Sequence, residues 1–377
     1  MSAVPPAAFA ATLAGLDRMT IGRLASLLHG NDPVHAVAMI SGDAPPNGIV
    51  AKLFDIEGLL TAWRAGIERR PPAMVWAACV EHGIQVLVRG ADEYPAQLAA
   101  DPAAPPVLFV RGSFATLGGR RVGVVGTRNA TAAGRATATS MGSDLAASGV
   151  HVVSGLARGI DGCAHRGALA VADGAAPLGV VASGLDVVYP REHRALWDAV
   201  AERGVLVSEA PPGTPPEAHR FPLRNRIIAA MSEVLVVVES RETGGSLLTV
   251  GEAKLRGVMV MAVPGSVHNR AARGTNDLVR DGSPVAIDAT DVLVALGLDS
   301  RRAGGAVYDP RPRPRGADRE MLEVCAEPRT LEQCSLLSGR SLVECAMSLA
   351  RLEVHGWLHQ VNGWFEAIGP WGQGSAH

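Results

Sequence analysis

Residues 121–128, RVGVVGTR, and residues 151–161, HVVSGLARGID, decide the fold of this chain. Each stretch is a short apolar run that ends in glycine and arginine, and a helix-forming segment follows it. Continuous short apolar runs are typical of buried parallel strands. The glycine-bearing turns are therefore expected where strands end and helices begin, at a sheet edge where backbone N–H groups favour phosphate.

The same pattern extends through the middle of the chain. Strands are expected at 84–88, 107–110, 122–125, 151–153, 180–182, 205–207, 234–238, 258–263 and 285–287. Helices are expected at 132–147, 162–172, 193–203, 225–231, 247–256 and 275–280. Strands that alternate with helices of this length predict an α/β fold, an extended Rossmann-like parallel sheet with helices on both faces.

Smaller regions flank this sheet region, which we place at residues 83–298. Residues 1–82 have apolar side chains at helical spacing, interrupted by proline and glycine, and predict a small helical domain. Residues 299–317 are rich in arginine and proline, as in a semi-rigid linker. Residues 318–377 contain three helical segments and an Asn-Gly hairpin turn, which predict a winged-helix-like domain. Its third helix carries both charge signs, so a DNA-reading role and a protein-contact or dimer role both stay open.

Composition restricts the class of protein. The chain has 377 residues, 47% hydrophobic and 19% charged, with a formal net charge of −2. A dedicated nucleic-acid binder is usually basic, so any phosphate-binding surface has to be a local patch. The five cysteines form no C-x-x-C pair, which predicts a reducing cytoplasm and no metal site. No signal peptide or membrane-spanning run is expected, so we predict a cytoplasmic protein.

Candidate ligand-binding residues lie in four turns that follow predicted strands. They are Gly126, Thr127 and Arg128; Gly155, Arg158 and Gly159; Arg224, Asn225 and Arg226; and Gly245 and Ser246. Glycine allows close backbone approach, and arginine offers a planar fork for phosphate. Arginines two positions apart on a helix point in different directions, so which of Arg224 and Arg226 faces a ligand stays open.

Three further residues are expected to support these turns rather than bind. Asp161 is placed to cap the helix that carries His165, His165 is expected to pack inside the protein, and Glu239 ends a strand. Ser246 is expected to be an N-cap. No Walker, zinc-protease or nucleophile-elbow motif occurs, and the G-x-G-x-x-G spacing is not intact, so no cofactor and no catalysis are predicted.

These blocks together resemble the DNA-processing protein A (DprA/Smf) family. The resemblance is carried, in order, by 124–128, 154–161, 164–169, 184–190, 208–213, 221–228, 245–247, 263–265 and 274–276. In their order and spacing, the blocks span about half of the chain. The helical front (SAM-like) and the winged-helix-like end fit the same family's three-part layout.

The resemblance implies a homodimeric single-stranded DNA-binding protein without catalysis of its own. Such proteins receive and protect incoming DNA in natural transformation and load the RecA recombinase, displacing single-strand-binding protein. On the matching positions, the resemblance implies phosphate contacts at Gly126, Thr127, Arg128, Arg158, Arg224 and Arg226, with the turn 244–246 as a weaker candidate. The sequence does not indicate whether the source is naturally transformable.

Two other interpretations remain. Nucleoside-monophosphate phosphoribohydrolases share the broad fold, and residues 244–252 loosely imitate their glycine-rich turn, with Glu252 as a conceivable catalytic carboxylate. The missing second Gly-Thr and the presence of the arginine-bearing turns argue against that enzyme. Alternatively, the protein is mainly an adaptor whose flanking domains recruit recombination factors.

Overall fold

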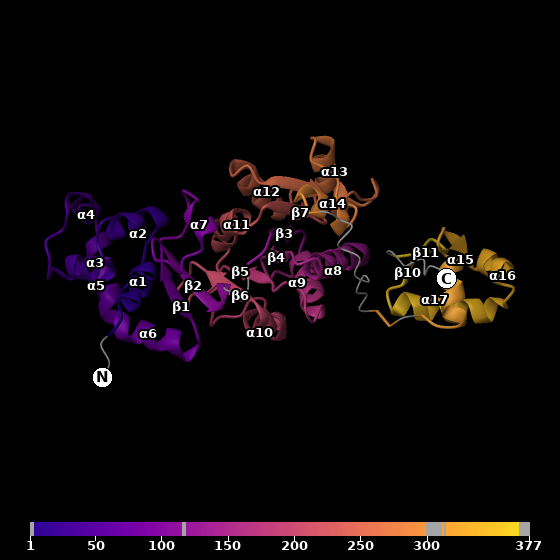
Figure 1. Ribbon diagram of the computed structural model, residues 1–377, viewed down its shortest axis with the longest axis horizontal. Helices are drawn as coiled ribbons and strands as arrows, with labels where there is room; N and C mark the ends of the chain where they lie inside the picture. The colour runs from indigo at the N-terminus through magenta and orange to yellow at the C-terminus, as the bar shows by residue number, and fades with distance from the viewer. Residues whose placement is uncertain (1–3, 115–117, 299–310, 313, 369–377) are drawn as a thin grey trace.

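The computed structural model describes residues 4–114, 118–298, 311–312 and 314–368. Figure 1 shows helices at one end, a sheet in the middle and a small helical segment with its own sheet at the other end. The first six helices are α1 (Pro6–Ala14), α2 (Ile21–Leu28), α3 (Pro33–Ser41), α4 (Gly48–Phe54), α5 (Leu59–Arg69) and α6 (Pro72–Glu81).

The central sheet has eight strands. In chain order they are β1 (Gln85–Val88), β2 (Val107–Gly112), β3 (Arg121–Val125), β4 (His151–Ser154), β5 (Leu178–Val180), β6 (Val205–Ser208), β7 (Val234–Val237) and β8 (Met259–Ala262). Their spatial order is β1-β2-β6-β5-β4-β3-β7-β8. The six strands from β6 to β8 are parallel, whereas β1 and β2 pair antiparallel at one edge. The Rossmann-like fold class is confirmed, with this antiparallel edge added.

Helices cover both faces of the sheet. They are α7 (Ala96–Ala99), α8 (Ala132–Ala147), α9 (Ile160–Ala170), α10 (Arg194–Arg203), α11 (Arg220–Ala230), α12 (Ser246–Leu255), α13 (Arg273–Arg280) and α14 (Ala289–Ala295), with short 3-10 turns at Arg191–His193 and Arg270–Ala272. Side chains of α8, α9 and α14 form one core layer with alternate strand residues, and α11 to α13 form the other.

Two expectations need correction. The strand expected at 285–287 is reduced to a single bridge between Val285 and Ala262, because Asp288 already caps α14. The helix expected from Asn225 begins at Arg220 instead. Pro222 lies in its first turn, where proline is tolerated because the N–H it lacks has no partner within the helix.

The N-terminal helices share a core with the sheet. Leu13 and Trp63 belong to the same apolar cluster as Phe109 of β2 and Trp197 of α10. All four side chains are fully buried. The helices before residue 82 and the sheet after it therefore share one apolar core across the expected domain boundary.

The C-terminal segment contains α15 (Ala317–Val324), β9 (Arg329–Thr330), α16 (Leu331–Ser338), α17 (Leu342–Val354), β10 (Leu358–Val361) and β11 (Trp364–Ala367). The expected linker lies mostly outside the described residues. At its end, Arg311 stacks on Trp357, with 3.8 Å from Cζ to the ring centroid, and donates to the Gly356 carbonyl. Arg311 therefore packs against the C-terminal segment.

Helices α8 and α9 pack closely against each other at Gly167 of α9. A Cβ at Gly167 would lie 2.0 Å from the Thr139 carbonyl oxygen of α8. We expect Gly167→Ala to lower the unfolding free energy by about 1–3 kcal/mol, because the two backbones have to separate. Gly251→Ala is the control, since nothing lies within 4 Å of its Cβ position in α12, and it should be neutral or stabilising. Urea unfolding of both variants tests this; equal midpoints would contradict it.

Candidate nucleic-acid interface

A cleft of about 700 Å³ lies at the carboxyl ends of β3 and β7. The chain leaves β3 through α8 toward β4, while β7 lies on the other side of β3. This is the topological switch point, where open α/β sheets bind ligands. The loop after β3, the loop after β7 and the start of α11 line the cleft.

Backbone hydrogen bonds hold neighbouring loops of this edge together. The Thr127 N–H donates to the Glu239 carbonyl at 2.7 Å, and the Ile160 N–H donates to the Thr127 carbonyl at 3.3 Å. Gly159 has a φ of +71°, and a Cβ there would lie 2.3 Å from the Thr127 carbonyl. Gly126 and Gly159 are thus required for loop packing, and Gly126 and Thr127 also line the cleft.

Glu239 is buried beneath the start of α8. Its carboxylate accepts from the Thr131 N–H and hydroxyl, both at 2.8 Å, and Thr131 caps α8. The N-terminus of α8 is therefore occupied from within the protein. Glu239 supports the loop and does not line the cleft.

Asp161 does not cap α9, contrary to expectation. No side chain caps this helix, and the Asp161 carboxylate instead accepts from the Gly155 N–H at 3.1 Å. Burial raises the pKa of Asp161, and the neighbouring Arg224 guanidinium opposes that shift. The carboxylate folds back onto its own turn because the reversed chain brings the Gly155 N–H within reach.

Arg224 lies in the wall of the cleft and is almost completely buried. Its guanidinium donates to the Val180 carbonyl, and a Cβ at Gly155 would lie 2.2 Å from Nη1. Burial lowers the pKa of Arg224 to about 10, partly offset by Asp161, so the group stays charged at neutral pH. Arg224 therefore locks the turn at Gly155 and adds a fixed positive charge to the cleft.

Arg226 points away from the cleft. Its guanidinium pairs with the Glu209 carboxylate, and only 7% of its side chain is exposed. Asn225, by contrast, lines the cleft beside Arg224. Arg224 and Arg226 are two positions apart, and on a helix of 3.6 residues per turn that separates their directions by about 200°. Arg226 therefore does not belong to the surface of the cleft.

Arg158 lies in the turn that begins at Gly155, and His165 lies in α9, which follows that turn. Arg158 is exposed, pairs with Glu192, and borders a smaller hollow that shares Arg128 with the cleft. His165 is fully buried in α9, and burial lowers its pKa to about 3, so the ring is neutral and packs in the interior.

The start of α12 forms the opposite wall. Gly244, Gly245 and Ser246 line the cleft, but Ser246 is not the expected N-cap. The helix begins at Ser246 itself, whose hydroxyl donates to the Ser240 hydroxyl at 2.8 Å. No side chain caps α12, and the residues at its start line the cleft. The positive end of its helix dipole therefore faces the cleft.

Sequence reasoning missed several residues that line the cleft, and four of them are polar or aromatic side chains that a nucleic acid could contact. They are Asn129, Tyr189, Phe221 and Arg241. The Tyr189 and Phe221 rings lie 5.5 Å apart, and the Arg128 guanidinium lies 4.8 Å from the Phe221 centroid. Arg241 lies four positions after the end of β7, as Arg128 lies three positions after the end of β3, and this repeated position was the available signal.

The alternative catalytic carboxylate is not in the cleft. Glu252 of α12 forms an ion pair with Arg256 of the same helix at 2.5 Å. It is absent from the lining of the cleft.

Residues 85–297 match the family model of DNA recombination-mediator protein A. This chain belongs to that family. The DNA processing protein DprA of Bacillus subtilis is 39% identical over 59% of this chain and 74% of its own length. The crystal structure of DprA from Streptococcus pneumoniae superposes with a TM-score of 0.64 at 27% identity, covering 77% of this chain and 98% of that one.

A second solved structure extends the agreement in fold. DprA from Helicobacter pylori, described for its single-stranded DNA binding mode, superposes with a TM-score of 0.51 at 23% identity, covering 56% of this chain and 95% of that one. Family membership supports a DNA-processing role in recombination. No helix in the described part of the chain is both long and apolar enough to cross a bilayer.

Proposed function

We propose that this protein binds single-stranded DNA in the switch-point cleft, without regard to sequence and without catalysing a reaction. The cleft combines Arg128, Arg224 and Arg241 with the uncapped start of α12. Arginines and backbone N–H groups neutralise phosphates irrespective of base identity. The single-stranded DNA binding described for the Helicobacter pylori relative supports this proposal.

The aromatic pair Tyr189 and Phe221 accounts for the preference for single strands that we propose for this protein. Tyr189 is 38% exposed, and both rings line the cleft. An unpaired base can stack on such a ring, whereas bases inside a duplex present no free face. The arginines hold the backbone while Tyr189 and Phe221 receive bases.

The competing function, hydrolysis of a nucleoside monophosphate, lacks a carboxylate to perform it. Asp161 is the acidic residue that lines the cleft, and its carboxylate is engaged by the Gly155 N–H and faces Arg224. Glu252 is paired with Arg256 elsewhere. We therefore propose a binding protein rather than an enzyme.

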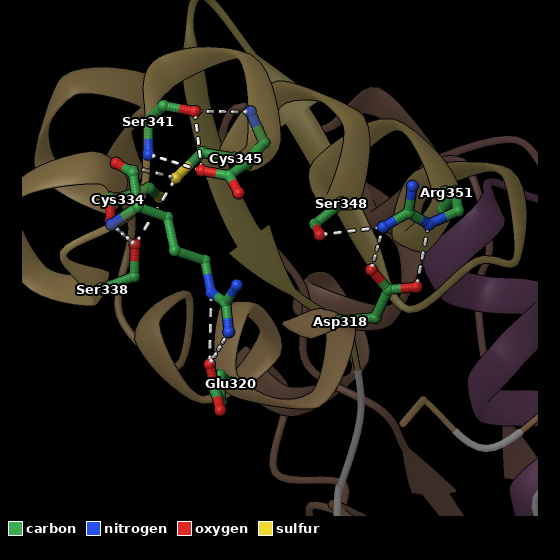
Figure 2. A network of polar contacts seen from close by, with 10 residues as sticks. Asp318, Glu320, Cys334, Ser338, Ser341, Cys345, Ser348 and Arg351 are labelled. Carbon is green, nitrogen blue, oxygen red and sulfur yellow. Dashed lines mark hydrogen bonds and ion pairs between the residues drawn. The ribbon is translucent and has the colours of Figure 1, made fainter. Parts of the chain in front are cut away.

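The C-terminal segment has a different proposed role. Figure 2 shows the Arg351 guanidinium of α17 bound to the Asp318 carboxylate. The Arg340 guanidinium binds Glu320 in the same way. Arg319 and Arg329 are likewise paired, and Val343 and Met347 of α17 are exposed. A duplex-reading helix needs free cations. We propose that this winged-helix-like segment contacts proteins and that the whole chain works as a homodimer that protects DNA, displaces single-strand-binding protein and loads RecA in the cytoplasm.

A salt titration with a fluorescent oligonucleotide tests the proposed function. We expect the full chain to prefer the single strand to the duplex, with no nucleotide or metal added. The logarithm of its affinity should fall linearly with the logarithm of salt, by about 0.7 per phosphate contact. Equal affinity for both forms, or release of free base from AMP, would reject the proposal.

A further inference from the structure

The loops at the carboxyl edge form a longer series than the cleft itself. Beyond the contacts of Thr127 with Glu239 and Ile160, the Gly274 N–H donates to the Ser240 carbonyl at 2.7 Å. This bond joins the loop after β7 to the first turn of α13, which follows β8. Four consecutive strand ends, in the order β4, β3, β7 and β8, are thus connected by backbone hydrogen bonds.

Each of these strand ends presents exposed arginine. Arg158 follows β4, Arg128 follows β3 and Arg241 follows β7. Arg270 and Arg273 follow β8, and both are exposed. Neighbouring strands lie about 4.8 Å apart, so the series extends over about 14 Å. That is a row of cations rather than a single pocket.

The loop after β8 is held in place. Asn276 accepts from the Gly265 N–H and donates to the Gly265 carbonyl, both at 3.0 Å. Among the described residues, no carboxylate pairs with Arg270. Arg273 has Glu242 as its nearest carboxylate, at 4.0 Å, and both side chains are more than half exposed. Such a loose exposed pair contributes little and leaves the guanidinium able to bind an anion.

On the other side of the cleft, toward β6, other parts of the protein cover this edge of the sheet. The loop after β6 is covered by the N-terminal helices, since Arg70 donates to the Pro212 carbonyl at 2.9 Å. Gly15 at the end of α1 packs against Pro211. Asp186, after β5, adds a carboxylate there that accepts from the Gly213 N–H. Away from β8, a polyanion leaving the cleft meets Arg158, which is already paired with Glu192, and then covered loops, whereas toward β8 it meets Arg270 and Arg273.

We infer that a bound single strand continues from the cleft past Arg241 onto the loop after β8, where Arg270 and Arg273 contact its phosphates. This inference rests on the proposed function and gives the site a second subsite. The two subsites differ in what they offer: aromatic rings and cations in the cleft, but cations alone beyond β7. Longer strands therefore gain affinity through charge.

Oligonucleotides of about 4 and about 16 nucleotides, the limits of common site sizes, test this inference on the full chain. The R270A/R273A variant should bind the longer strand several-fold more weakly, with a salt slope reduced by about 1.4, and should bind the shorter strand normally. Glu242→Gln should strengthen binding of the longer strand. Arg280→Ala is the control, because Arg280 lies at the far end of α13, about 10 Å away, beside Asp277.

The outcomes separate this inference from the proposed function. If R270A/R273A binds both lengths like the unmodified protein while Arg128→Ala weakens both, the second subsite is wrong and the cleft stands. If Arg128→Ala also leaves both unchanged, the proposed function itself fails. An equal loss on both lengths, or a loss shared by Arg280→Ala, would likewise overturn the inference.

Discussion

Asp161→Ala should destabilise the protein and abolish binding of single-stranded DNA together. The carboxylate is buried against Arg224 and holds the Gly155 N–H. Its removal takes away the negative charge that offsets the burial of the Arg224 guanidinium and leaves the Gly155 N–H without its acceptor, which costs at least about 1–3 kcal/mol. The turn that positions Arg158 loses its internal tie at the same time. Chemical unfolding and oligonucleotide binding of the same preparation measure both effects.

A second substitution separates the two effects of Asp161. In D161A/R224M the buried guanidinium is gone as well, and we expect most of the lost stability to return, because no uncompensated buried charge remains. Binding should stay weak, since the fixed charge of Arg224 is missing from the cleft. An unchanged unfolding midpoint in Asp161→Ala would show that the Asp161 carboxylate does not hold this turn.

The R128A/R241A variant should lose most of its affinity for single-stranded DNA while folding normally. Both side chains are exposed and line the cleft from the loops after β3 and β7. A hydrogen bond to a charged group contributes about 1.5–3 kcal/mol, so each loss weakens binding roughly 10- to 100-fold. The log–log salt slope should fall by about 1.4.

The matched control is R69A/R319A, which changes the net charge equally. Arg69 pairs with Asp17 in the helical front, and Arg319 pairs with Glu323 in α15. Both lie outside the cleft, so affinity and slope should stay close to those of the unmodified protein. Equal losses in the two double variants would mean that net charge, rather than the cleft, determines binding.

The sequence predicted the parallel part of the sheet well because apolar runs and glycine turns are local signals. Helix α8 was predicted at 132–147, as found, since Thr131 caps an alanine-rich segment without interruption. The antiparallel pairing of β1 and β2 was not predictable, because strand direction leaves no periodicity in sequence. Helix α11 was predicted at 225–231 but begins five residues earlier, at Arg220, with Pro222 in its first turn.

The candidate site was predicted in part. The turns at Arg128, Arg224 and Ser246 do meet in one cleft, because parallel strands end at the same edge. Arg241, Tyr189 and Phe221 were missed because they come from two loops and the first turn of α11, which only the strand order brings together. The roles of Asp161 and Ser246 depend on partners in reversed turns, which local capping rules do not reveal.

The hydrogen bonds that join the strand-end loops have a thermodynamic consequence. Loops that are already ordered lose little conformational entropy when a ligand arrives. For this protein, nearly all of the ordering on binding should fall on the DNA strand, whose free form is flexible. Calorimetry should then give an unfavourable entropy that grows with oligonucleotide length and is almost the same for different loop-preserving variants.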